Sequence, residues 1–123
     1  MPDQGSRSDF DVLVVGGGPA GSTVSTLLQR MGWRVGLVEK DRHPRFHIGE
    51  SLLPWNLPIF ERLGVLAEVE KIGVPKLAAD FSLPDSAEFV RVDFSKAMRP
   101  TPPLAFQVRR AELDDLLLRT SAG

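Results

Sequence analysis

The chain has 123 residues, enough for one compact domain, and its 42% hydrophobic and 25% charged residues are ordinary for a globular protein. A net charge of -1 gives no electrostatic footprint for nucleic acid or an anionic membrane. With no cysteine and two histidines, disulfides, cysteine nucleophiles and a metal site are not expected. The polar N-terminus lacks an apolar signal core, and no apolar run approaches the ~20 residues of a membrane span, so we expect a cytoplasmic protein.

The first forty residues predict a strand–helix–strand unit that follows a disordered tail at residues 1–9. Residues 10–15 form a continuous apolar run, which is typical of a strand buried on both faces of a parallel sheet. A helix is expected from Pro19 to about residue 31, where Gly32 can end it. Its apolar residues recur at helical spacing: Val24, Leu27, Leu28 and Met31. Residues 33–39 are the second strand, parallel to the first.

The rest of the chain predicts a helical segment, a small hairpin and a last helix. After an irregular stretch, the expected elements are helices at 56–63 and 65–72, hairpin strands at 76–83 and 88–94, an extended piece at 105–108 and a helix at 111–120. No further strand uses that last helix as a crossover. We therefore expect residues 10–123 to be the N-terminal part of an incomplete α/β domain built on a Rossmann-like βαβ unit.

A dinucleotide fingerprint joins the first predicted strand and helix. Residues 16–21, Gly-Gly-Gly-Pro-Ala-Gly, fit the G-x-G-x-x-G pattern, and Glu39 follows about 20 residues later at the end of the next strand. Gly16 would allow the tight turn, Gly18 would let a pyrophosphate approach the backbone, and Gly21 would let the helix pack closely on the strand. The phosphates would lie on backbone N–H groups at the helix start.

The acidic residue Glu39 narrows the range of ligands that the glycine turn can bind. Glu39 would accept hydrogen bonds from ribose hydroxyls and disfavours a ribose 2′-phosphate, which makes NADP the less favoured ligand. FAD and NAD share the ADP half, so the fingerprint leaves both open, and a glycine-rich turn without a ligand is the structural alternative. Pro19, Ala20 and Lys40 complete the predicted ADP-binding set with the three glycines. The glycine turn followed by Glu39-Lys40 resembles the FAD-binding two-dinucleotide-fold proteins more than simple dehydrogenases, and this resemblance favours FAD.

A second motif carries a more selective resemblance. Residues 46–54, Phe-His-Ile-Gly-Glu-Ser-Leu-Leu-Pro, resemble the Gly-Glu-Ser/Ala-x-x-Pro segment of flavin-dependent halogenases and of the wider group-A flavin monooxygenase and geranylgeranyl-reductase superfamily. Residues 56–65, 74–81 and 108–114 resemble the helix, lysine-containing stretch and Val-x-Arg-x-x-Leu-Asp segment of the same proteins. Two departures are Ala78, where glycine is common, and the absence of Trp-x-Trp-x-Ile-Pro.

The resemblance implies FAD as the cofactor and adds several site residues. Gly49, Glu50 and Ser51 would lie beside the flavin, and Glu50 is also a candidate catalytic carboxylate. The alternative for Glu50 is capping the next helix, and for Ser51 either a hydrogen bond to FAD or capping. Arg110 would contact FAD. From its position alone, in the loop after the ribose-binding strand, Arg45 would neutralise the pyrophosphate, and a solvated surface arginine is the alternative for both.

Lys76 is the second candidate catalytic residue, and it too follows from the resemblance. In halogenases a lysine at this place is thought to receive hypohalous acid made from reduced FAD, oxygen and halide, and to deliver the halogen to an organic substrate. A strand-edge lysine is the alternative. The resemblance also implies a separate flavin reductase. Rival functions are a hydroxylating monooxygenase, a geranylgeranyl-reductase-like enzyme, or a non-catalytic nucleotide-binding fragment. On every one of these interpretations we expect these 123 residues alone to bind FAD weakly and to be inactive.

Overall fold

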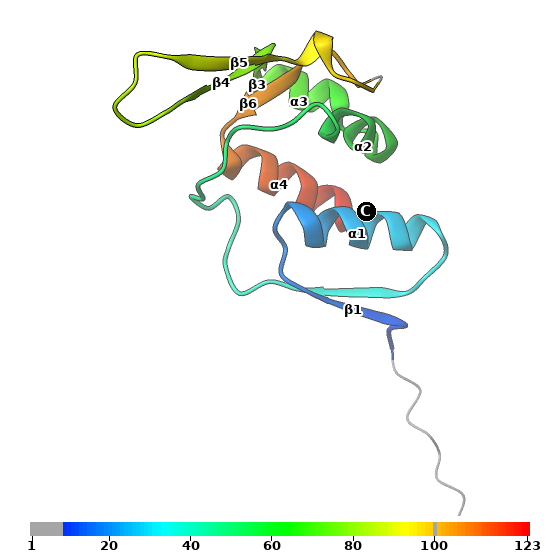
Figure 1. The fold of residues 1–123 in the computed structure, drawn as a ribbon. Coiled ribbons are helices and arrows are strands. Elements are labelled where there is room, and N and C mark those ends of the chain that lie inside the picture. Colours follow the sequence, from blue (N-terminus) through cyan, green and yellow to red (C-terminus); the bar gives the residue numbers. More distant parts are fainter. Residues whose placement is uncertain (1–8, 100) are drawn as a thin grey trace, which may run out of the picture. The chain divides into compact units, whose positions relative to one another are not determined.

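A computed structural model describes residues 9–99 and 101–123, so the predicted tail lies outside it except for Asp9. The elements in chain order are β1 (Val12–Val15), α1 (Pro19–Arg30), β2 (Val35–Val38), α2 (Asn56–Leu63), α3 (Leu66–Ile72), β3 (Gly73–Lys76), β4 (Ala78–Ser82), β5 (Phe89–Asp93), the 3-10 turn η1 (Phe94–Lys96), β6 (Ala105–Val108) and α4 (Arg110–Ser121) (Figure 1). They form two units, residues 1–45 with 114–123 and residues 46–113. The predicted α/β class is confirmed.

The first unit contains the expected βαβ arrangement. Strands β1 and β2 pair in parallel, with Val12 opposite Val35, and α1 connects and contacts both of them. Gly32 adopts a φ of 92° directly after the α1 cap, a conformation that favours glycine and ends the helix where predicted. At the start of the two strands, the guanidinium of Arg34 donates to the Asp11 carboxylate at 2.7 and 3.1 Å.

The most buried residues of α1 are small and polar, not the apolar residues that recur at helical spacing. Val24 and Met31 are 42% and 67% exposed, whereas the small residues Ser22, Ser25 and Thr26 are buried. Ser22 Oγ donates to the Gly17 carbonyl at 3.0 Å, and Thr26 Oγ1 donates to the carbonyl one helical turn earlier at 2.9 Å. Backbone carbonyls thus satisfy two of these hydroxyls, one in the glycine turn and one in the helix. The apolar spacing predicted the helix correctly, but it does not mark the residues that the helix buries.

The expectation that the first strand is buried on both faces is wrong for the described residues. Side chains alternate across a strand, so Val14, which contacts the α1 side at Gly21, and its neighbours Leu13 and Val15 lie on opposite faces. Leu13 and Val15 are 62% and 80% exposed, and Val38 of the next strand is 50% exposed. Helix α1 covers one face of the β1–β2 pair, and the apolar side chains on the other face are exposed to solvent.

The second unit is antiparallel. Strand β6 pairs with β3 on one side, and on the other side Ser51 forms a bridge with Gln107, supported by hydrogen bonds from Val108 N to Glu50 O and from Leu52 N to Phe106 O. Helices α2 and α3 pack on each other and α3 contacts β3 and β6. Buried apolar side chains of this unit are Phe60, Leu63, Val65, Val69, Phe94, Ala105, Phe106, Val108 and Leu113.

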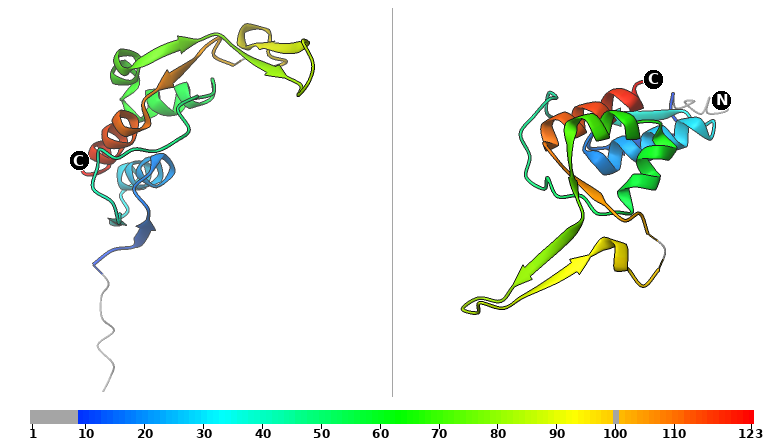
Figure 2. Two further views of the ribbon diagram at one scale, coloured as in Figure 1. Left: turned by 90° about the vertical axis from the view of Figure 1, so that its left-hand side faces the viewer. Right: turned by 90° about the horizontal axis from the view of Figure 1, so that it is seen from above.

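The predicted hairpin exists, but its first strand is divided. Strand β3 ends at Lys76, where it pairs with β6, and β4 begins after Leu77 and pairs with β5 from Ala78 opposite Asp93. Figure 2 shows β4 and β5 as a two-stranded arm continuing from β3. One extended run therefore serves two ladders, and Lys76 lies at the junction between them, which the sequence pattern did not indicate.

Candidate functional site

The glycine turn of the first unit has the geometry of a phosphate-binding loop. Gly16 has a φ of 104°, and a Cβ placed on Gly21 would lie 1.8 Å from the Gly16 carbonyl oxygen, so the turn and the helix start are in direct contact. Pro19 is in the first turn of α1, followed by exposed Ala20. A Cβ on Gly18 would meet only the Arg45 guanidinium at 3.8 Å, so the space beside this residue is open.

The start of α1 is available to an anion. Its N-cap, Gly18, makes no side-chain capping bond, and its first turn contains no acidic residue. The first N–H groups of a helix have no partner within the helix, and they carry the positive end of the helix dipole. A pyrophosphate therefore fits both the donors and the open space beside Gly18.

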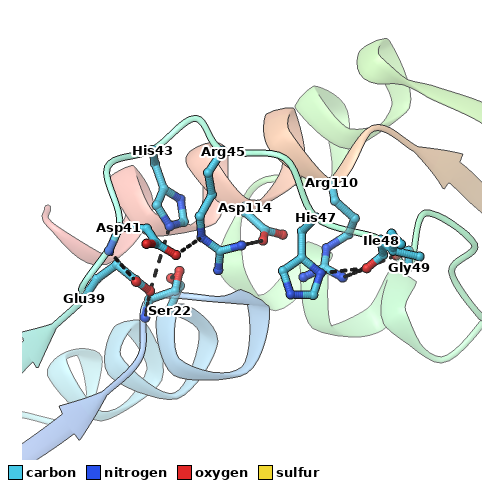
Figure 3. A network of polar contacts seen from close by, with 11 residues as sticks. Ser22, Glu39, Asp41, His43, Arg45, His47, Ile48, Gly49, Arg110 and Asp114 are labelled. Carbon is cyan, nitrogen blue, oxygen red and sulfur yellow. Dashed lines mark hydrogen bonds and ion pairs between the residues drawn. The ribbon is translucent and has the colours of Figure 1, made fainter.

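Glu39 lies at the end of β2 and closes the turn. Its Oε2 accepts a hydrogen bond from Gly17 N at 2.6 Å, and its Oε1 accepts one from Asp41 N at 2.9 Å (Figure 3). The bonds from Asp41 and Gly17, together with nearby Arg45 and His43, lower the pKa of Glu39. An ionised carboxylate keeps further lone pairs after two such bonds, so Glu39 can hold the turn and still accept ribose hydroxyls.

Arg45 is the cation nearest to the glycine turn. Its guanidinium lies 3.6 Å from Asp41 Oδ2 and 3.8 Å from Oδ2 of Asp114, whose side chain is fully buried (Figure 3). Two carboxylates thus hold Arg45, which is 18% exposed, beside Gly18. Lys40, the other predicted basic residue here, is exposed at the end of β2.

The second unit brings together the residues of the halogenase-like segment. Gly49 has a φ of 106°, and Arg110 at the start of α4 donates to the carbonyls of Ile48 and Gly49 at 3.0 and 3.4 Å (Figure 3). Arg110 therefore holds the backbone of the Gly49 turn through hydrogen bonds to its carbonyls. Glu50 is exposed, and its carbonyl accepts from Val108.

The hydroxyl of Ser51 bonds to a lysine outside the next helix. Helix α2 begins at Asn56, and its N-cap residue, Trp55, makes no side-chain capping bond. Leu53 N instead donates to Asn56 Oδ1 at 2.9 Å, which fixes the approach to the helix. Ser51 Oγ accepts a hydrogen bond from Lys76 Nζ at 2.6 Å. Lys76 and the Gly49–Ser51 turn, predicted separately, are thus brought together, while their roles toward FAD stay predictions.

Comparison with known proteins decides the family. The FAD binding domain family matches residues 9–120. The chain belongs to this family. FAD is therefore its cofactor, and the predicted flavoprotein resemblance is confirmed.

Several similar proteins are flavin-dependent halogenases. The chain is 42% identical to the flavin-dependent halogenase armH3 of Armillaria mellea, over 91% of this chain and 22% of that protein. It is also 42% identical to a tryptophan 2-halogenase of Chondromyces crocatus, over 93% of this chain and 21% of that protein. The solved structure of the myxobacterial chondrochloren halogenase CndH is similar with a TM-score of 0.82 and 37% identity, over 92% of this chain and 26% of that one.

The chain thus spans about a fifth of the length of these curated relatives. The resemblance to flavin-dependent halogenases is confirmed for this part of their sequence. No helix in the described parts of the chain is long and apolar enough to cross a membrane. Within residues 9–99 and 101–123, no group of three acidic or histidine side chains is placed to hold a metal ion.

Sequence reasoning missed three contributors to the two sites. Asp114 is the last residue of the segment that resembles Val-x-Arg-x-x-Leu-Asp. Its ion pair with Arg45 was not expected because the two residues are far apart in sequence. His43 lies in the irregular stretch after β2, but its side chain is 2% exposed and its Nε2 lies 3.9 Å from Glu39 Oε2, which the sequence did not indicate. The centre of the Phe94 ring lies 5.4 Å from Lys76 Nζ. Both residues belong to the predicted hairpin, but the sequence pattern did not indicate this contact.

Proposed function

We propose that this chain is the FAD-binding part of a flavin-dependent halogenase in which Lys76 relays the halogen to an organic substrate. One observation carries the proposal: Lys76 Nζ lies 2.6 Å from Ser51 Oγ, within the Gly49–Pro54 segment that halogenases share. An ordinary strand-edge lysine would extend into solvent. The amine of Lys76 is instead held against the segment expected beside the flavin.

The residues of the first unit would bind the ADP half of FAD. The N–H groups at the start of α1 would hold the pyrophosphate, Arg45 would neutralise it, and Glu39 would accept from the ribose hydroxyls. Supporting this assignment, the space beside Gly18 is open to an incoming group, while Glu39 is already ordered by two backbone donors. Gly49 would allow the backbone to approach the flat flavin ring.

Bound FAD supplies the redox chemistry that converts oxygen and halide to hypohalous acid. The neutral amine of Lys76 would attack the halogen of that acid, forming an N–X bond as the O–X bond breaks. The departing hydroxide takes a proton from the nitrogen and leaves as water, so the atoms and charges balance. The electrophilic halogen then passes from nitrogen to an electron-rich carbon of the organic substrate, and a proton from that carbon returns to the amine.

Two further expectations belong to this proposal. Reduced FAD would come from a separate flavin reductase, and the cytoplasmic location expected from the sequence stays a prediction. The nearest rival keeps FAD and transfers oxygen to the substrate as a hydroxyl group. The two reactions differ in whether the product contains halogen.

The test uses the full-length protein that carries this chain, supplied with FAD, a flavin reductase and bromide. Wild type is compared with Lys76→Ala and with Lys71→Ala, a matched loss of an exposed lysine on α3. We expect Lys76→Ala to abolish the brominated product while Lys71→Ala retains it. If Lys76→Ala leaves bromination unaffected, the proposed relay through Lys76 is refuted. Hydroxylated product without brominated product would favour the monooxygenase.

A further inference from the structure

The surroundings of Lys76 define where its amine can lie. Nζ donates to Ser51 Oγ at 2.6 Å, lies 3.5 Å from the Leu52 carbonyl oxygen and is 5.4 Å from the centre of the Phe94 ring. The Phe94 side chain is itself buried, so the ring is a fixed surface. A long, flexible amine is therefore restrained from three directions.

The strand arrangement explains why Lys76 reaches Ser51. Lys76 pairs with Ala105 on one side of β6, and Ser51 pairs with Gln107 on the other side. The lysine side chain must cross β6 to reach the serine. Ala105 is fully buried and has only a methyl group, which leaves room for that crossing.

We propose that Ser51 is the positioning residue of Lys76, an inference that rests on the proposed halogen relay. Among the three neighbours, Ser51 makes the shortest contact, and 2.6 Å is typical of a strong hydrogen bond from a charged donor. A hydroxyl can also donate. Ser51 therefore accepts from the ammonium and donates to the neutral amine, so the nitrogen keeps one position while its protonation changes in the relay.

The alternative is that Ser51 merely accepts a surface hydrogen bond without consequence for the reaction. The two views differ in what is lost when the hydroxyl is removed. A displaced amine would intercept less hypohalous acid, so more would escape to solution, although its formation would continue. If the contact is merely structural, Ser51→Ala would alter stability but would not change the share of hypohalous acid that escapes to solution.

The experiment compares Ser51→Ala, Ser51→Thr and Ser82→Ala in the full-length protein with FAD, a flavin reductase and bromide. Ser82 is an exposed serine on the arm of the hairpin and serves as the matched control. The first readout is the ratio of brominated substrate to hypobromous acid caught by an added trap. We expect Ser51→Ala to lower this ratio roughly tenfold, about the effect of one hydrogen bond, with Ser51→Thr and Ser82→Ala near wild type.

A second readout is independent of turnover. Peptide mass spectrometry measures the rate of acetylation at Lys76, with Lys71 as internal reference. This rate should differ from wild type in Ser51→Ala and return to the wild-type value in Ser51→Thr. An unchanged ratio and an unchanged acetylation rate in Ser51→Ala would overturn the positioning role. If Lys76→Ala still halogenates, the relay itself is wrong, whereas loss in Lys76→Ala with full activity in Ser51→Ala refutes only the role of Ser51.

Discussion

Two glycines of the turn allow the binding of FAD to be separated from the folding of the first unit. In Gly18→Ala the new methyl group would meet only the Arg45 guanidinium at 3.8 Å, an ordinary contact. The backbone there, with φ -72° and ψ -175°, is open to alanine. Because alanine is a poorer N-cap than glycine, we expect the free energy of unfolding to fall by less than about 1 kcal/mol.

The same methyl group would occupy the space through which the pyrophosphate reaches the helix start. Loss of one charge-assisted hydrogen bond, worth roughly 1.5–3 kcal/mol, weakens FAD binding about 10- to 150-fold. The measurement is the Kd for FAD by titration of flavin fluorescence, paired with thermal unfolding of the apoprotein. Wild-type affinity in Gly18→Ala would refute the placement of the phosphates at this turn.

Gly21→Ala is the matched opposite. Its methyl group would lie 1.8 Å from the Gly16 carbonyl oxygen and 3.3 Å from Val14 Cγ1, so a backbone atom must move by more than 1 Å. Such overpacking costs about 3 kcal/mol, at the upper end of the usual range, and lowers Tm by roughly 10 °C or more. An unchanged Tm in Gly21→Ala would show that helix and strand are not in the close contact described.

Two further substitutions test the electrostatics of the first unit. Arg34 lowers the pKa of Asp11 from 3.8 to about 2, so the pair stabilises the fold above pH 4 and its contribution is lost as the pH falls toward 2. Thermal unfolding of Asp11→Asn should show lower stability at neutral pH and a flatter decline below pH 4, and parallel curves would contradict this. His43→Phe removes two buried ring nitrogens without hydrogen bonds and the attraction of the imidazole to Glu39 at 3.9 Å; because the unpaired nitrogens cost more than this attraction contributes, stability should rise by about 1 kcal/mol. A fall in Tm would show that the imidazole bonds to Glu39 in solution.

Local chemistry made the first unit largely predictable. The turn needs a glycine where Gly16 has φ 104° and where a side chain on Gly21 cannot fit, so both residues leave a readable signal in the sequence. Glu39 is similarly readable because the end of β2 lies beside the turn. The buried side of α1 was not, because Ser22 bonds to the Gly17 carbonyl in the turn and Thr26 to a helix carbonyl, which hydrophobic periodicity does not register.

The second unit was less predictable because its decisive contacts are distant in sequence. The sequence around Ser51 does not indicate that its hydroxyl accepts a hydrogen bond from Lys76. This bond forms because the two residues pair with β6 from opposite sides. The resemblance to halogenases brought both residues to attention without giving the distance between them. If the proposed relay operates, substitutions at Ser51 should change where the halogen goes before they change how much FAD is bound.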